Sequence, residues 1–219
     1  MNERRTIITA IFPTGCLPGI GIAHPAAAAT ITVNSTADSA VPADGDCTLR
    51  EAIENANDDV DVTGGDCLPG SGDDSIDMTG LSGQITLTSE LPYIGSNVVI
   101  NAPGARALAV DGNDAFPVFR VRDPSTVEIN NLTVQHGNAV GSGGDGGGIR
   151  NTGTLTLTNV AVLNNESVEG GGIFNAGDGT LHLINSIVSG NFAEFGGGID
   201  NEEGIMAISS IAPYPETAV

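Results

Sequence analysis

The sequence contains no lysine and no tryptophan, and only 4% of its 219 residues are aromatic. Seven arginines face 27 acidic residues, which gives a formal net charge of −20. A surface of that charge repels phosphate backbones and anionic lipid headgroups, so it argues against binding to nucleic acid or to a membrane surface. The core must be built from Val, Ile, Leu and Ala, and the 31 glycines are typical of a β protein with many tight turns.

Long apolar runs are also scarce, and none outside the N-terminus approaches the roughly 20 residues that a transmembrane helix needs. Residues 1–29 combine a basic start, an apolar stretch and small residues before a cut after Ala28 or Ala29, which predicts a secretory signal peptide. Cys16 lies within it and only loosely resembles a bacterial lipoprotein cleavage site. We therefore expect a secreted or cell-surface protein whose mature chain has no transmembrane helix.

Removal of that segment leaves two cysteines, Cys47 and Cys67. An even pair in an oxidising compartment predicts a disulfide, which would close a loop of about 20 residues and stabilise the fold by roughly 3 kcal/mol in the chain-entropy model. A two-cysteine metal site would need further His or Cys ligands, and none lies nearby in the sequence.

One helix is predicted directly after Cys47. Thr48, Leu49, Arg50 and Glu51 fit a capping box. The apolar residues Leu49, Ala52, Ile53 and Ala56 then lie on one face of the helix. The other ordered segments read as short strands between Gly, Asn, Asp or Pro, at residues 30–34, 84–88, 97–101, 118–121, 126–129 and 132–135.

An internal repeat runs through the C-terminal half. Three glycine triplets, 24 and 26 residues apart and each followed by Ile-x-Asn, consist of Gly146, Gly147 and Gly148, then Gly170, Gly171 and Gly172, then Gly196, Gly197 and Gly198. A second kind of corner, which ends strand-like runs, recurs at Asn131, Asn159 and Asn185. There Asn tolerates left-handed backbone geometry, and its amide can bond to the next copy as a ladder.

A period near 25 residues with three short strands matches one turn, or rung, of a parallel β-helix. Each strand then pairs with its equivalent about 4.8 Å above and below. A β-sandwich also consists of short strands, but it gives no reason for a fixed period with identical corners. We predict an all-β, right-handed parallel β-helix of the pectin-lyase-like kind with a short N-terminal capping helix.

The run from Cys47 to Ile53, with Asn55, Ala56 and Asn57 after it, resembles the motif of CSLREA-domain proteins, with Thr48 in place of the usual Ser. The resemblance covers about residues 30–87. It implies an exported bacterial or archaeal protein that carries this module ahead of β-helical repeats and has no defined reaction. The glycine corners more weakly resemble the repeats of chlamydial-type polymorphic outer-membrane proteins, although the Phe of those repeats is missing here.

This comparison divides the chain into a signal peptide at 1–29, a capping module at 30–80, β-helix rungs at 81–208 and an irregular tail at 209–219. A capping role makes physical sense because an open rung exposes unpaired strand edges. Arg50 and Glu51 are then structural residues, and we expect Arg50 to pair with an acid on the first rung. Because the third glycine triplet begins a rung that the tail does not finish, we also expect a truncated or frame-shifted relative of a longer β-helix protein.

The acidity has two interpretations: general solubility, as in a salty habitat, or binding of Ca²⁺ through carboxylate-rich turns. The densest acidic cluster lacks the fixed spacing of a Ca²⁺ loop and consists of Asp58, Asp59, Asp61, Asp66, Asp73, Asp74 and Asp77. No cofactor is predicted, and Ca²⁺ stays a candidate without an assigned set of ligands.

Catalysis has to be argued from residues, because parallel β-helices include both polysaccharide enzymes and proteins without activity. Three groups of residues are candidates for a catalytic site: Arg120 with Arg122 and Asp123, the acidic residues Asp111, Asp114 and Asp145, and the pair His136 and Gly137. His182 is expected to face solvent. No Ser, His and acid arrangement and no phosphate-binding loop stands out.

No catalytic residue is therefore assigned. We predict a structural, adhesive or glycan-interaction role, with an extracellular glycan or another surface protein as partner. The alternative is a polysaccharide lyase or glycoside hydrolase that acts on acidic polysaccharide.

Overall fold

The computed structural model describes residues 27–211. Residues 1–26 of the predicted signal peptide and residues 212–219 of the predicted tail lie outside the described part.

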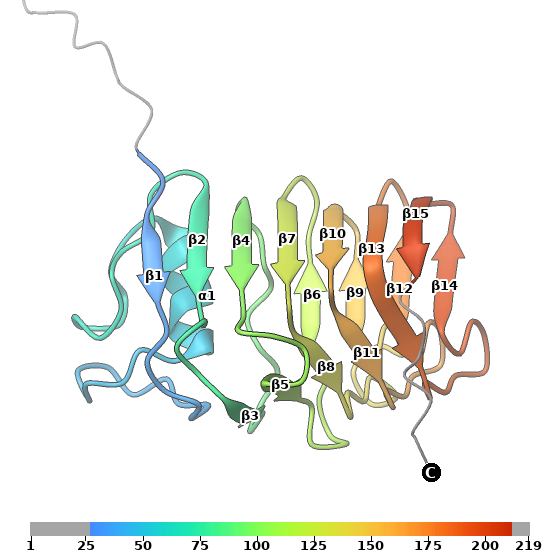
Figure 1. The fold of residues 1–219 in the computed structure, drawn as a ribbon, viewed down its shortest axis with the longest axis horizontal. Helices are drawn as coiled ribbons and strands as arrows, with labels where there is room; N and C mark the ends of the chain where they lie inside the picture. Colours follow the sequence, from blue (N-terminus) through green and yellow to red (C-terminus); the bar gives the residue numbers. More distant parts are fainter. Residues whose placement is uncertain (1–26, 212–219) are drawn as a thin grey trace, which may run out of the picture.

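The chain winds into a right-handed parallel β-helix of about 5 turns, as the repeat predicted (Figure 1). Its strands stack into three parallel sheets. Sheet A contains β1 (Thr30–Thr32), β2 (Asp74–Asp77), β4 (Val98–Asn101), β7 (Thr126–Asn130), β10 (Thr154–Thr158), β13 (Thr180–Ser189) and β15 (Ile205–Ile211). Sheet B contains β3 (Gly83–Thr86), β5 (Leu108–Asp111), β8 (Thr133–Gln135) and β11 (Ala161–Leu163), together with the second half of β13. Sheet C contains β6 (Phe119–Val121), β9 (Ile149–Asn151), β12 (Ile173–Ala176) and β14 (Ile199–Glu202).

The core is a set of apolar rows that run along the axis of the coil. In sheet A, Ile129, Leu157 and Leu183 are cross-strand neighbours on three successive rungs, and none is more than 4% exposed. The alternation of apolar and polar residues along each strand produces these rows, since successive side chains point to opposite faces. The period of the sequence therefore fixes both the rung length and the register.

Asparagines occupy the corner between sheets A and B. Asn131, Asn159 and Asn185 have φ values of 61°, 55° and 49°, in the left-handed region that Asn tolerates better than most residues. The side-chain amide of Asn185 donates a hydrogen bond to Asn159, and that of Asn159 donates one to Asn131 at 3.1 Å. The three residues thus form a ladder along the edge of the coil.

A second asparagine ladder lies inside sheet C. Asn151 donates to Asn175 at 2.7 Å, and Asn175 donates to Asn201 at 2.6 Å. Asn151 and Asn175 are completely buried, so these bonds satisfy amides that would otherwise be costly to bury. This ladder explains why each glycine triplet is followed by Ile-x-Asn.

The first glycine of each triplet turns the chain into sheet C. Gly146, Gly170 and Gly196 have φ values of 67°, 57° and 56°. A residue with a Cβ atom is strained in that conformation, and glycine is not.

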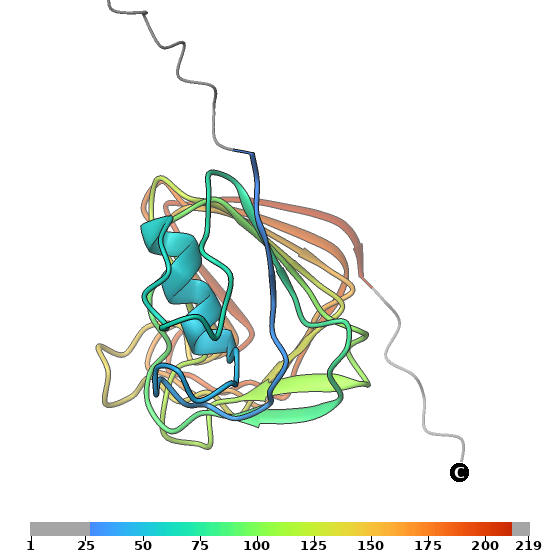
Figure 2. The same cartoon turned by 90° about the vertical axis from the view of Figure 1, so that its left-hand side faces the viewer.

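Helix α1 (Leu49–Asp58) lies across the N-terminal end of the coil (Figure 2). Thr48 is its N-cap, and the Thr48 and Glu51 side chains each accept a hydrogen bond from the other's backbone N–H in a capping box. Leu49 and Ile53 are at most 1% exposed, and the helix packs against β1 and β2. The helix and residues 33–73 around it, called the cap below, therefore cover this end of the core.

A disulfide closes the cap. Cys47 and Cys67 are bonded, as predicted, with their Cα atoms 4.8 Å apart. The buried side chain of Asn55 holds the same loop, since it accepts a bond from the Val62 N–H at 2.9 Å and donates one to the Leu68 carbonyl at 3.0 Å. The segment after the helix is thereby fixed at two points.

Arg50 connects the cap to the first rung, but not in the way expected. Its guanidinium donates two hydrogen bonds of 2.9 Å to Asp38, and it also donates to the backbone carbonyls of Ser89 and Glu90. The prediction of an acidic partner on the first rung is wrong, because Asp38 belongs to the cap. The first rung contributes carbonyl oxygens instead.

The prediction of an irregular tail from residue 209 is wrong for residues 209–211. These residues continue β15, which pairs in parallel with β13 through register shifts near Ile184. Backbone pairing with β13 therefore extends beyond the point where the glycine repeat stops.

Candidate functional site

A polar pocket of about 270 Å³ lies beside sheet C and is lined by Tyr93, Arg120, Ser142, Gly143, Asp145 and Arg150. Arg120 and Arg150 are cross-strand neighbours on β6 and β9. The other lining residues come from two connections, one between β3 and β4 and one between β8 and β9. The parallel register of the rungs thus brings two arginines together from positions 30 residues apart.

Arg120 is the best-connected residue of the polar pocket. It donates to the Glu90 carboxylate at 2.7 Å, to the Ser142 carbonyl at 3.0 Å and to the Tyr93 hydroxyl at 3.3 Å. These three partners hold the planar guanidinium in one orientation, which a flexible surface arginine does not have.

Tyr93 provides an aromatic surface with cations against it. The guanidinium of Arg122 lies 4.4 Å from the ring centroid, and that of Arg120 lies 5.5 Å from it. Both distances fall within the range of a cation–π contact. Across the polar pocket, Arg150 pairs with Asp145 at 3.4 Å, so the site contains ion-paired donors and acceptors beside a ring.

The cap positions the segment that carries Tyr93 and Glu90. Arg50 holds the Glu90 carbonyl, and the Asn57 side chain donates to the Tyr93 carbonyl at 2.7 Å and accepts from the Gly95 N–H at 2.9 Å. The motif residues of the helix therefore determine where one wall of the polar pocket lies.

Acidic residues gather further along sheet C, toward the C-terminal end. The row that begins with Arg120 and Arg150 continues through Phe174 to Asp200. Desolvation, and then repulsion from Asp145, Glu202 and Asp200, raises the pKa of Glu169 beside this row. The face thus changes from arginine-rich to carboxylate-rich along the axis.

His136 and Asp111 form a pair away from the polar pocket, at the end of sheet B. Nδ1 of His136 lies 2.7 Å from the Asp111 carboxylate, which also accepts bonds from the Gln135 side chain and the Asn113 N–H. Burial acts to raise the pKa of Asp111, but these hydrogen bonds outweigh it and the net pKa is lowered. His136 remains 39% exposed, so its ring is accessible to solvent.

The other sequence candidates do not assemble into one site. Asp114 adjoins His136 only through its backbone N–H, and Asp145 lies in the polar pocket and does not join Asp111. Asp123 is exposed next to Arg122, and His182 lies half-buried on β13 between Thr156 and Ala207.

The aspartates of the Asp-rich region are used one by one in turns. Asp61 and Asp77 accept from Thr63 and Thr79, Asp66 accepts from the Asp44 and Gly45 N–H groups, Asp59 accepts from Gly72, and Asp73 accepts from Asn97. Asp74 is buried and accepts from the Ala29 and Ser71 N–H groups. Within residues 27–211, no group of three or more His, Cys, Asp or Glu side chains is placed to hold a metal ion.

The sequence indicated Arg120 and Arg122 as one candidate group and Asp145 as part of another, but Tyr93, Glu90 and Arg150 were missed as members of the site. Tyr93 is one of only two tyrosines, and its rarity was the available signal. Its contacts depend on a loop that no repeat specifies.

Comparison with known proteins finds no matching family model, no matching curated protein and no matching solved structure. Among the described residues, no helix is long and apolar enough to span a bilayer.

Proposed function

We propose that this is an exported β-helix protein that binds a neutral glycan, without catalysis, in the polar pocket around Tyr93, Arg120 and Arg150. The observation that carries the proposal is the ring of Tyr93 set beside two ion pairs, Arg120 with Glu90 and Arg150 with Asp145. An aromatic face binds the apolar face of a sugar ring, and fixed donors and acceptors bind its hydroxyl groups.

The charge distribution supports a neutral ligand in preference to an acidic one. Both pocket arginines already have a carboxylate partner, so the site offers balanced hydrogen bonding. A net charge of −20 also repels an approaching polyanion. We therefore expect a polysaccharide without uronate or sulfate groups to be preferred.

Export is part of the proposal and is supported by the disulfide and by the resemblance to CSLREA-domain proteins. A disulfide persists in an oxidising compartment, outside the cytosol. The motif residues Arg50, Glu51, Asn55 and Asn57 each bond within the cap or between the cap and the first rung. Such roles agree with a capping module placed ahead of β-helical rungs on the cell surface.

The direct test is binding of the full chain to immobilised neutral polysaccharides, such as xyloglucan, galactomannan and laminarin. Polygalacturonate and alginate serve as acidic comparisons. We expect a neutral polymer to bind with little salt dependence, and Tyr93→Ala to weaken binding at least tenfold. Arg106→Ala is the matched control, because Arg106 is exposed and lies outside the pocket lining. If no neutral polymer binds, or if Tyr93→Ala binds as well as the unaltered chain, the proposal is wrong.

The paired His136 and Asp111 favour a second candidate, a hydrolase or lyase that acts on acidic polysaccharide. A carboxylate that orients a solvent-accessible imidazole is an arrangement used in general acid–base catalysis. Cleavage of polygalacturonate by the chain that is lost in His136→Ala, and kept in His182→Ala, would favour this candidate over the non-catalytic one.

A further inference from the structure

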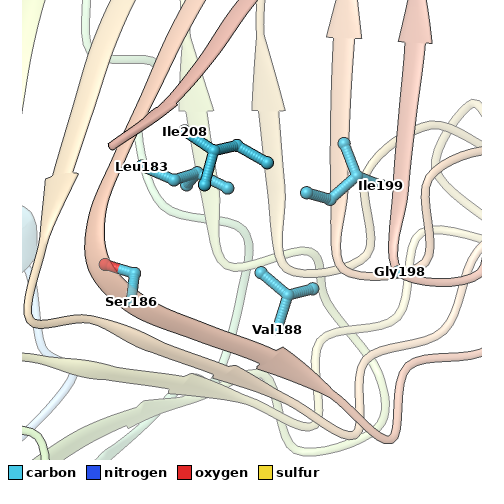
Figure 3. Close-up of a pocket in the computed structure, with 6 residues that line it drawn as sticks. All are labelled: Leu183, Ser186, Val188, Gly198, Ile199 and Ile208. Atoms are coloured by element: carbon cyan, nitrogen blue, oxygen red, sulfur yellow. The ribbon is translucent and has the colours of Figure 1, made fainter. Parts of the chain in front are cut away.

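The apolar rows of the core continue onto the last rung, where they become exposed. In sheet A, Leu157 is completely buried and Leu183 is 4% exposed, but their cross-strand successor Ile208 is 46% exposed. A hollow of about 350 Å³ opens at this end, lined by Leu183, Ser186, Val188, Gly198, Ile199 and Ile208 (Figure 3). Phe192 and Phe195 are 67% and 60% exposed on the adjoining connection. We call this surface, together with β14 and β15, the open end.

The glycine triplets show what the internal rungs require. A methyl group built at Gly147 would lie 2.7 Å from the carbonyl oxygen of Gly171, and one built at Gly171 would lie 2.5 Å from that of Gly197. Gly172 has the same relation to Gly198, at 2.5 Å. The second and third glycines of a triplet are therefore required by the backbone of the rung that follows, and not by their own rung.

The last triplet keeps these glycines although the described residues give no such reason for them. A Cβ atom at Gly197 would lie 3.3 Å from its nearest neighbour, the Asn191 carbonyl oxygen, and one at Gly198 would lie 3.7 Å from a Val188 methyl group. Neither residue is among those with positive φ. Glycine at both positions would be required if another backbone lay against them, in the way that Gly197 and Gly198 lie against Gly171 and Gly172 of the preceding rung.

From this geometry we propose that the open end is a docking face for one further parallel rung, donated by another polypeptide. The donated segment pairs with the edges of β14 and β15 that no other described strand occupies, places Val, Ile or Leu over the hollow, and brings its backbone against Gly197 and Gly198. Such strand addition uses main-chain hydrogen bonds for affinity and side-chain pockets for specificity.

The acidic residues at the open end indicate which side chains the donated polypeptide should carry. Asp200 and Glu202 lie on β14 and Glu203 directly follows it, and the last two are exposed. A donor with Lys or Arg on its outward positions complements them, whereas a second copy of this chain would bring like charges together. A second copy could meet this face only tail to tail, because the cap covers the other end, and its strands would then run antiparallel.

The experiment uses a synthetic peptide that copies residues 160–184 with Glu166→Lys and Glu169→Lys, titrated against the full chain. This stretch is the internal equivalent of the donated rung, since it carries one strand of sheet B, a glycine triplet, one strand of sheet C and the sheet A part of β13. We expect the peptide to slow amide exchange in β14 and β15, and a scrambled peptide of the same composition to leave exchange unchanged.

The glycines provide the decisive variants. Gly197→Ala should lower the melting temperature of the chain alone much less than Gly171→Ala does, but weaken peptide binding at least tenfold, because the new methyl group occupies the place of the donor backbone. Gly171→Ala, the matched control, should lower the melting temperature without any peptide. Peptide binding that is equal in Gly197→Ala and the unaltered chain would show adhesion to exposed apolar residues and overturn the proposal.

Two further outcomes would also overturn it. One is the absence of peptide binding at millimolar concentration. The other is concentration-dependent dimerisation of the chain, measured by sedimentation, that protects β14 and β15 in place of the peptide.

Discussion

The two ends of this β-helix differ in how the same repeat is closed. At the N-terminal end, α1, a disulfide and the buried Arg50–Asp38 pair cover the core, and the cap residues Leu49 and Ile53 are at most 1% exposed. At the open end, Ile205 and Ile208 are 65% and 46% exposed. Stacked rungs bury each other's apolar side chains, but a terminal rung has no neighbour on one side. A separate capping segment is therefore needed to cover the core and the strand edges there.

The difference also separates structural residues from those available for binding. The cap uses charged and polar side chains that are buried and fully partnered, such as Arg50 and Asn55. The polar pocket uses partly exposed ones, such as Arg150 and Tyr93. The cap is therefore expected to control stability, and the pocket is expected to tolerate substitution.

The largest effect should come from breaking the buried ion pair of the cap. Arg50→Ala leaves Asp38, whose side chain is 1% exposed, without its cationic partner and with Thr88 as its remaining donor, and we expect a loss of about 3–5 kcal/mol in the free energy of unfolding. Arg150→Ala is the matched control, since Arg150 and Asp145 are about one third exposed, and should cost about 1 kcal/mol or less. Urea denaturation of both variants measures the comparison, and equal losses would contradict it.

Truncation of one apolar side chain to alanine, on a central rung or on the last rung, tests the same contrast within one row of the core. Leu157→Ala should cost about 2–5 kcal/mol, because the side chain is completely buried in a central rung. Ile208→Ala, in the same row but 46% exposed, should cost well under half as much. The melting temperatures of the two variants give the answer, and a larger effect at Ile208 would show that the open end is covered.

The smallest effect is expected from acid. Burial acts to raise the pKa of Asp38, but hydrogen bonds from Arg50 and Thr88 outweigh it and lower the net pKa. A lowered pKa in the folded state contributes stability above the ordinary aspartate range, and that contribution is lost as pH falls through the folded value. The free energy of unfolding should therefore hold between pH 7 and pH 5 and decline below about pH 4.

A variant outside the cap can distinguish the contribution of Asp38 to the acid transition from that of another aspartate. Asp111→Asn removes a second aspartate with a lowered pKa, which lies in sheet B and not in the cap. Its acid transition should be shallower than that of the unaltered chain, yet α1 should still lose helical circular dichroism below pH 4. An unchanged helix signal down to pH 2 would contradict the role given to Asp38.

Most of the fold was predictable because the period of the sequence repeat indicates the length of a rung. The glycine triplets and the corner asparagines recur at equivalent positions of successive rungs, so local sequence was enough to indicate the period and the parallel stacking. The helix and the disulfide were equally local features. Asp38 was not predictable as the partner of Arg50, because it lies in a loop of the cap that has no repeat and no periodicity.

The polar pocket was predictable only in part, for the same reason. Arg120 and Arg150 lie 30 residues apart, further than the 24 and 26 residues between the glycine triplets, so the period alone does not align them. Tyr93 and Glu90 reach them from a segment that the cap holds in place through Arg50 and Asn57. The extent of β15 was missed because residues 205–211 lack the alternation of apolar and polar residues that predicts a strand. In each case the missing information was a contact between a repeat and a segment outside the repeat.

Hydrogen exchange of the full chain at neutral pH, followed segment by segment, tests the contrast between the two ends most directly. We predict that amides of α1, β1 and β2 exchange about as slowly as those of the central strands β7 and β10, and that β14 and β15 exchange orders of magnitude faster. Protection of β14 and β15 equal to that of the central rungs, or exchange in α1 as fast as in β15, would contradict the account.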